Sequence, residues 1–337
     1  MTLCGMANNR VSAETARPVP RRPSIQSALT AGVTQVALRP ISGAVPLNRA
    51  GVWFTRTLVA TSMGIFGPPL RGTQVTPVRE GAVVGEWVRA PGVRHSGRAV
   101  FYLHGSAYVI CSARTHRGLA SRLSRATGLP VFLPDYRLAP EHLFPAAADD
   151  VEAGYRWLLT QGFDATDIVV AGDSAGGHLA IDLVIDNART RTAQPAAVVL
   201  FSPLIDLTFG LAAEQERQRK DPMITAKAAR ALVDLYTDGQ PEDAPRLRLD
   251  LAGVAALPPV LVQAGGAEML SADARYLQRI VEEAGGKCEL EIWPGQMHVF
   301  QALPFLIPEA AHALRRAANF VSRALNNQDT FVKEQVS

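Results

Sequence analysis

From residue 73 onward, short apolar runs alternate with stretches whose apolar residues recur at helical spacing. The middle runs, such as AVFYL at 99–103, are continuous, as expected for parallel strands that are buried on both faces. Strands that alternate with helices predict a mostly parallel sheet with helices on both faces. Eight strands are predicted, at 74–79, 83–89, 99–103, 131–133, 168–171, 198–201, 260–263 and 289–293, the first two as a hairpin-like pair.

The stretches between these strands carry the stripes of core-facing helices. Leu119 and Leu123, for example, are four residues apart and therefore lie on the same face of a helix. Helices are predicted at 115–127, 145–160, 177–188, 273–284 and 308–325.

One segment interrupts the alternation. Residues 204–256 contain no convincing strand, but they hold a charged run, EQERQRKD at 214–221, and a helical stretch at 225–236 that Thr225 is placed to cap. We expect this insertion to form a cap over the sheet. Its apolar residues either line an acyl pocket or pack the cap on itself; they are Phe209, Met223, Ile224 and Leu235.

The whole chain is expected to divide as follows. The parts are a flexible N-terminal arm (1–24), an N-terminal cap segment (25–72), a core (73–203 and 257–327), the cap insertion (204–256) and a polar tail (328–337). Residues 57–70 are the nearest candidate for a membrane span, but this stretch is too short to cross a bilayer. We interpret it as buried or cap-forming, with loose attachment to a membrane surface as the alternative.

Composition narrows the class of protein. With 47% hydrophobic and 19% charged residues, the chain is typical of a soluble globular protein, and its net charge of +3 without a basic cluster argues against nucleic acid as a partner. Three widely spaced cysteines, Cys4, Cys111 and Cys288, favour reduced thiols over disulfides or a zinc site. Since the N-terminus also does not resemble a secretory signal, we expect a cytoplasmic protein with no integral membrane association.

The stretch VVAGDSAGGHLA places Ser174 between Gly172 and Gly176, after a predicted strand and at the start of a predicted helix. A nucleophile elbow needs this strand–turn–helix context, and it needs small residues where strand and helix pass closely. The alternative is a tight turn that requires small residues and has no catalytic role.

A second stretch, FYLHGSAYVIC at 101–111, follows the strand at 99–103. Small residues in such a loop let backbone N–H groups face a ligand, as an oxyanion hole requires. The N–H of Ala175, at the start of the helix after Ser174, would be a further donor.

These two stretches, together with DYRLAPEHLFPAAADD at 135–150, resemble the hormone-sensitive-lipase-like carboxylesterases (bacterial family IV) of the α/β-hydrolase fold. The chain is most similar to the bacterial esterases of that group, including the Lip-type enzymes of mycobacteria. The resemblance spans roughly residues 75–325 and implies an α/β-hydrolase core with a helical cap.

The resemblance also implies the roles of individual residues. The family's oxyanion loop reads His-Gly-Gly-Gly, so Ser106 and Ala107 take the donor positions here, together with Ala175. The catalytic acid corresponds to Glu268, with Asp273 as the runner-up, and the catalytic histidine to His298, which Val299 follows where the family has Gly. The order Ser174, Glu268, His298 is the chain order of α/β-hydrolases.

The other histidines have structural interpretations. His104 is expected to order its loop through hydrogen bonds, and His116 is expected at the surface. Arg137 and Glu141 are expected to hold the 135–150 loop by ion pairing.

The expected function is hydrolysis of short- to medium-chain carboxylic esters, or acyl-glycerols, through an acyl-enzyme on Ser174, without metal or organic cofactor. Two alternatives stay open. One is a small-ligand-binding protein on the same fold, and the other is an amide or peptide hydrolase with the same triad. A homodimer is possible.

Overall fold

The eight predicted strands form one sheet in the computed structural model, which describes residues 17–37, 39–105, 107–254 and 256–336. The strand order is β1-β2-β4-β3-β5-β6-β7-β8; β2 pairs antiparallel with both neighbours, and the other pairs are parallel. Each predicted strand is confirmed to within two residues at either end. The strands are β1 (Gln74–Glu80), β2 (Val83–Arg89), β3 (Ala99–Leu103), β4 (Val131–Pro134), β5 (Ile168–Asp173), β6 (Ala197–Phe201), β7 (Val260–Gly265) and β8 (Cys288–Trp293).

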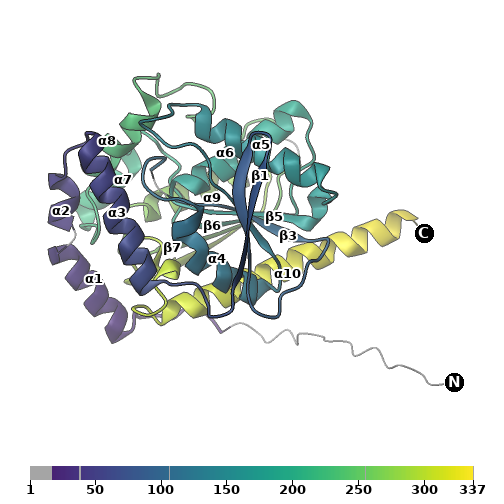
Figure 1. Cartoon of the computed structure of the whole chain (residues 1–337), viewed down its shortest axis with the longest axis horizontal. Coiled ribbons are helices and arrows are strands. Elements are labelled where there is room, and N and C mark those ends of the chain that lie inside the picture. Colours follow the sequence, from purple (N-terminus) through teal and green to yellow (C-terminus); the bar gives the residue numbers. More distant parts are fainter. Residues whose placement is uncertain (1–16, 38, 106, 255, 337) are drawn as a thin grey trace.

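Helices cover both faces of this sheet (Figure 1). One face packs against α4 (Ala113–Thr127) and α10 (Glu309–Val336), and the other against α5 (Ala146–Thr160), α6 (Ala175–Thr190) and α9 (Ser271–Glu283). In β3, Val100 and Tyr102 belong to the core on the α4 side, whereas Phe101 and Leu103 belong to the core on the α6 side. The period of two and the burial on both faces explain why the strand is a continuous apolar run.

Further helices lie outside the two layers. The N-terminal ones are α1 (Ile25–Ala37), α2 (Arg39–Ala44) and α3 (Arg49–Phe66), and the insertion holds α7 (Gly210–Gln218) and α8 (Ala226–Thr237). Figure 1 shows α1, α2 and α3 together at one end of the molecule. An ion pair between Arg39 and Glu216 joins α2 to α7, which connects the two segments that we assign to the cap.

The insertion shows one confirmed prediction and one omission. The Thr225 side chain accepts a hydrogen bond from the Ala228 N–H at 3.1 Å, so it caps α8 as expected. Helix α7 was not predicted, since its sequence looked only like a charged run. Ala212 is its single buried residue, so α7 has no apolar stripe that periodicity could detect.

The C-terminal helix is longer than expected. Helix α10 runs to Val336 instead of ending near 325, so the backbone of the expected tail at 328–337 is helical through Val336. No Gly or Pro follows Pro308, hence nothing in the sequence breaks the helix. Residues 1–16 of the expected arm lie outside the described residues. No helix in the described ranges is long and apolar enough to cross a membrane.

Candidate active site

Ser174 stands in the turn between β5 and α6. Its backbone has φ 51° and ψ −122°, a conformation that non-glycine residues rarely adopt and that often marks functional turns. A Cβ at Gly176 would lie 2.0 Å from the Leu103 carbonyl oxygen, and one at Gly172 would lie 2.6 Å from the Gly176 carbonyl oxygen. The glycines are therefore needed for close approach of strand and helix, as a nucleophile elbow requires.

The expected oxyanion loop follows β3, which is the neighbour of β5 in the sheet. Ala107 has φ 49°, so an alanine adopts the left-handed region at one of the family's glycine positions. Ser106 lies outside the described residues. The loop is held by its neighbours: Tyr136 Oη donates to the His104 carbonyl oxygen at 2.6 Å, and the Ala139 N–H donates to the Tyr108 carbonyl oxygen at 2.9 Å.

His104 is buried and orders the loop as predicted. Its ring stacks on Tyr136 at 4.1 Å between centroids, and its Nδ1–H donates to the Gly105 carbonyl oxygen at 3.1 Å. Burial lowers the pKa of His104 to about 3, and the nearby His116 contributes in the same direction. His104 therefore stays neutral at ordinary pH and is a structural group rather than a base.

Asp173, the residue before the candidate nucleophile, holds the expected oxyanion loop in place through a hydrogen bond. Its Oδ1 accepts hydrogen bonds from the Gly105 N–H at 2.9 Å and from the Tyr102 hydroxyl at 2.8 Å, and it lies 3.3 Å from His116 Nε2. Burial opposes ionisation of Asp173, but His116 and the hydrogen bonds outweigh it and lower its pKa. The expectation that His116 is a surface residue is wrong: only 2% of the residue is exposed, because its helix packs that face on the sheet.

Glu268 and His298 meet directly. His298 Nδ1–H donates to Glu268 Oε2 at 2.5 Å, while Glu268 Oε1 accepts from the Gly265 N–H at 2.5 Å and from the Ser202 hydroxyl at 2.7 Å. Glu268 lies in the turn after β7, and His298 lies in the loop after β8. Parallel strands end at the same edge of the sheet, so these turns come together beside the end of β5.

The charge environment favours the protonated form of His298. Burial disfavours the charged imidazole, but the hydrogen bond and charge of Glu268, with the charges of Asp221 and Asp173, outweigh burial and raise its pKa. Asp221 is itself buried, and its carboxylate accepts hydrogen bonds from the N–H groups of Met223, Ile224 and Met269. It is thus a fixed charge near the histidine that sequence patterns did not single out.

Asp273, the runner-up for the acid, has a different role. Its Oδ1 accepts hydrogen bonds from the N–H groups of Ile205 and Asp206, both at 2.8 Å, and so supports the chain after β6. Burial raises the pKa of Asp273 to about 7, even though these backbone hydrogen bonds act in the opposite direction. The structure therefore brings Glu268, and not Asp273, to His298.

Ser202 is a further member of the site that the sequence did not reveal. Its hydroxyl donates to Glu268 and accepts from the Val299 N–H at 3.0 Å, so it joins the acid to the histidine loop. The preceding residue, Phe201, accepts a hydrogen bond from the Ser174 N–H at 3.1 Å, which links the elbow to the same point. Its position in the sequence could have indicated it, because Ser202 directly follows β6 and so lies at the edge of the sheet where the other site residues lie.

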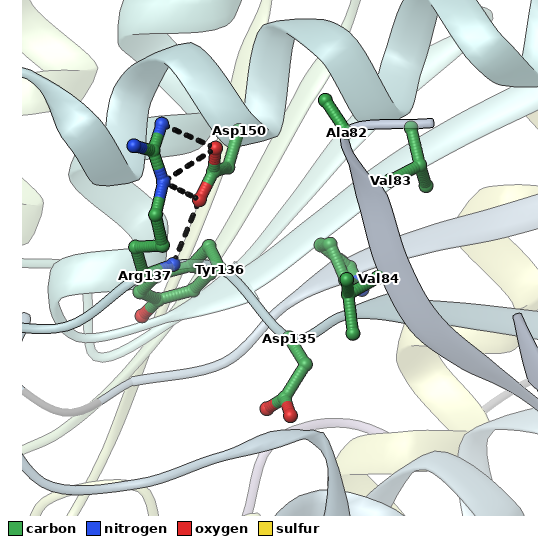
Figure 2. A pocket seen from close by; sticks show the side chains of 8 residues that line it. Ala82, Val83, Val84, Asp135, Tyr136, Arg137 and Asp150 are labelled. Atoms are coloured by element: carbon green, nitrogen blue, oxygen red, sulfur yellow. Dashed lines mark hydrogen bonds and ion pairs between the residues drawn. The ribbon is translucent and has the colours of Figure 1, made fainter. Parts of the chain in front are cut away.

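Arg137 and Glu141 form ion pairs as expected, but with separate partners. Arg137 binds Asp150 at 2.7 Å, and Glu141 binds Arg56 of α3 at 2.8 Å. The first pair borders a cavity of about 120 Å³ at the end of β4, shown in Figure 2. None of the three predicted catalytic residues lines it, so this cavity is separate from the candidate site.

Within the described residues, no cluster of three or more His, Cys, Asp or Glu side chains could hold a metal ion. Cys111 and Cys288 are free thiols, and Cys4 lies outside the described part of the chain.

Comparison with known proteins supports the fold. A family model described as alpha/beta hydrolase fold matches residues 100–302. The chain belongs to this family, and specifically to its hormone-sensitive-lipase-like branch.

Two curated relatives come from Mycobacterium tuberculosis. Carboxylesterase/phospholipase LipF is 37% identical over 268 residues, which cover 76% of this chain and 71% of that protein. Esterase LipU is 37% identical over 249 residues, which cover 70% of this chain and 82% of that protein. Among solved structures, an esterase from the bacterial hormone-sensitive lipase family matches with a TM-score of 0.80 and 34% identity, over 90% of this chain and 99% of that one.

Proposed function

We propose that this chain is a serine carboxylesterase in which Ser174 is the nucleophile, His298 the general base and Glu268 the acid that orients it. The observation that carries the proposal is the hydrogen bond between His298 Nδ1 and Glu268 Oε2, at the sheet edge where the elbow of Ser174 also lies. Membership of the hormone-sensitive-lipase-like branch and the esterase relatives support ester hydrolysis as the reaction class.

In the first half-reaction, neutral His298 accepts the Ser174 hydroxyl proton at Nε2 while the serine oxygen attacks the ester carbonyl carbon. Ionised Glu268 holds the Nδ1–H tautomer and stabilises the imidazolium that forms. We assign the hydrogen bonds to the oxyanion to the N–H groups of Ser106, Ala107 and Ala175, which stand at the donor positions of the family. His298 then gives its proton to the departing alcohol oxygen, which leaves an acyl-enzyme.

In the second half-reaction, water takes the place of the alcohol. His298 accepts a proton from water as its oxygen attacks the acyl carbon, and the proton returns to the Ser174 oxygen when the carboxylic acid leaves. Each hydrogen bond to the oxyanion lowers the activation barrier of such a step by about 3 kcal/mol. Asp173 and Tyr136 would act on this step by holding the loop that carries the donors.

We assign the acyl end of a short- to medium-chain ester to the space under residues 25–72 and 204–256, which would form the cap. Met223 packs with the cluster that contains Met297, the neighbour of His298. The three other apolar residues of the predicted pocket, Phe209, Ile224 and Leu235, pack instead on the large core on the α6 side. We therefore assign these three residues to internal packing and Met223 to contact with the substrate.

The two alternative functions make different predictions. A small-ligand-binding protein would not need a histidine held by a buried acid, so the contact between Glu268 and His298 argues for catalysis. Amide hydrolysis uses the same residues, and matched p-nitrophenyl esters and p-nitroanilides would separate it from ester hydrolysis. Location in the cytoplasm and a homodimer remain predictions of the sequence.

The test is Ser174→Ala, with Ser96→Ala, an exposed loop serine, as the matched control. We expect Ser174→Ala to lower kcat on p-nitrophenyl butyrate by about 10⁶-fold, and to abolish labelling by a fluorophosphonate. The control should behave as the parent. Near-normal hydrolysis by folded Ser174→Ala protein would refute the proposal.

A further inference from the structure

Helix α1 presents its apolar side chains to solvent. Ile25, Leu29, Val33 and Val36 follow a spacing of four, four and three residues, and their exposures are 78%, 65%, 65% and 80%. The spacing places them on one face, about 16 Å long. We call these four side chains the α1 stripe. The residues of α1 that are buried against the protein are polar: Ser27 and Thr34.

The polar face fixes this orientation. The Ser27 hydroxyl donates to a carboxylate oxygen of Glu309 at 2.6 Å, and the Ser24 N–H and hydroxyl donate to the same carboxylate at 2.6 and 3.0 Å. Burial opposes ionisation of Glu309, but these hydrogen bonds outweigh it and lower its pKa. A charged acceptor strengthens such bonds, so α1 is held through its polar side while the α1 stripe stays uncovered.

Other exposed apolar side chains gather in the same part of the chain. Nine of the eleven exposed large apolar side chains that the structure describes lie between residues 25 and 66. Those on α3 include Trp53 at 67% and Ile65 at 59% exposure. Figure 1 shows that α1 and α3 occupy the same end of the molecule. Such a concentration of apolar surface marks an interaction site.

The charge of this segment indicates what the site contacts. Between residues 17 and 79 the sequence has no Asp or Glu and eight arginines, although the whole chain carries 31 acidic residues. Arg39 and Arg56 form ion pairs with Glu216 and Glu141. Arg21 and Arg22, immediately before α1, are exposed, as is Arg49 at the start of α3. Exposed apolar side chains next to cations are the pattern of a helix that lies in an anionic membrane interface.

We propose that the α1 stripe, flanked by Arg21 and Arg22 and assisted by Trp53 on α3, binds the surface of an anionic phospholipid bilayer. The aliphatic side chains would enter the boundary between headgroups and acyl chains, and the guanidinium groups would bind lipid phosphates. A second copy of the chain fits less well, because a twofold contact through this surface would bring together two segments whose charged residues are all arginines, and these would repel each other. Since the binding does not use Ser174, this proposal is independent of the proposed esterase activity.

The experiment measures sedimentation of the full chain with vesicles of phosphatidylcholine alone or with about one third phosphatidylglycerol. We expect the parent to bind the anionic vesicles, and binding to weaken with salt. Leu29→Gln/Val33→Gln should weaken binding by at least about tenfold, because two aliphatic side chains lose their apolar contact. Arg21→Gln/Arg22→Gln should weaken it by about 30-fold, because each arginine contributes about 1 kcal/mol near an anionic surface.

Matched controls separate this surface from general effects. Arg279→Gln/Lys287→Gln removes the same charge from exposed positions at α9 and before β8, and Leu143→Gln removes an exposed apolar side chain outside the segment. Both should bind vesicles as the parent does. Hydrolysis of a soluble short ester, or thermal unfolding if the chain proves inactive, checks the fold of every variant.

Equal sedimentation of the parent and Leu29→Gln/Val33→Gln would overturn the proposal, and so would failure of the parent to bind anionic vesicles. Light scattering tests whether a second copy of the chain binds this surface instead. If the parent is a dimer that Leu29→Gln/Val33→Gln converts to monomers, the surface binds a second copy and the proposal is wrong. Trp53 gives a second signal, because its emission should shift to the blue on binding and Trp53→Phe should remove that shift.

Discussion

Two carboxylate–histidine pairs lie near the end of β5, and only one has the form of a catalytic pair. Glu268 binds His298 at 2.5 Å, and Asp173 lies 3.3 Å from His116. Both carboxylates are buried and both accept backbone or hydroxyl hydrogen bonds in addition. A nearby carboxylate therefore does not by itself distinguish the candidate base from a structural histidine.

The difference lies in the other side of each imidazole. The His298 side chain keeps 18% of its surface exposed, and its Nδ1 is the atom that Glu268 occupies. The His116 side chain is only 3% exposed, and its Nδ1 lies 3.0 Å from Thr115 Oγ1 while Nε2 faces Asp173. Both nitrogens of His116 are thus engaged, whereas part of the His298 side chain stays exposed. A base needs a carboxylate on one nitrogen and an open path to the other.

The largest effect should come from exchanging each histidine for Gln. His298→Gln should lower kcat by about 10⁶-fold, because the proton acceptor is lost. His116→Gln keeps a donor for Asp173 and should leave kcat within about tenfold of the parent, while lowering thermal stability. Initial rates on p-nitrophenyl butyrate and melting curves of both variants check this. Comparable loss of kcat in the two variants would show that the pairs do not differ in function.

The two acids can be separated in the same way. Glu268→Gln should lower kcat by about 10⁴-fold, because the imidazole loses the charge that orients and stabilises it. Asp273→Asn should act mainly on stability, because Asp273 binds the backbone of Ile205 and Asp206 and not the histidine. If Asp273→Asn shows the larger loss of kcat with an unchanged melting temperature, the assignment of the acid is wrong.

The fold could be predicted from the sequence because each strand carries its own signal. Buried parallel strands such as 99–103 are apolar on both faces, so the local pattern alone locates them. The elbow was also locally visible, since its glycines reflect backbone contacts within one strand–turn–helix unit. Glu268 and His298, in contrast, were placed by resemblance, because nothing local distinguishes them from other acids and histidines.

What the sequence did not show depends on contacts between distant segments. Ser202 is recognisable only once β6 is known to end beside the turns that carry Glu268 and Val299. His116 lies on a helix whose buried face was underestimated, because a histidine is a polar residue in any periodicity pattern. Helix α1 is the reverse case, since an apolar stripe predicts burial and the structure exposes it.

The dependence of activity on pH tests the surroundings of His298. The free enzyme needs neutral His298, so kcat/KM should rise with pH, and because the pKa is raised, the midpoint should lie above 6.5. Below that midpoint kcat/KM should fall about tenfold per pH unit. Asp221→Asn removes one of the charges responsible and should move the midpoint to lower pH.

The same pKa shift affects stability. A group whose pKa is higher in the folded state stabilises the fold below its unfolded pKa, and this contribution is lost as pH rises through the folded pKa. In His298→Gln, the loss of stability as pH rises through the folded-state pKa of His298 should be absent. Thermal melts of parent and variant at pH values below and above that pKa check this. For the activity measurement, a kcat/KM–pH profile of Asp221→Asn that coincides with the parent's would contradict the assigned effect of Asp221 on the pKa of His298.

The smallest expected effect concerns the oxyanion loop beside Asp173. Ala107 has φ 49°, and relieving an alanine in the left-handed region by Ala107→Gly should stabilise the chain by about 1 kcal/mol, or about 2 °C in Tm. Ala60→Gly, at an exposed position inside α3, should instead destabilise it by about 1 kcal/mol. Opposite signs for one chemical change would show that the loop keeps a glycine conformation without the glycine. If kcat of Ala107→Gly at least equals that of the parent, the strained alanine is not required for the position of the donor N–H.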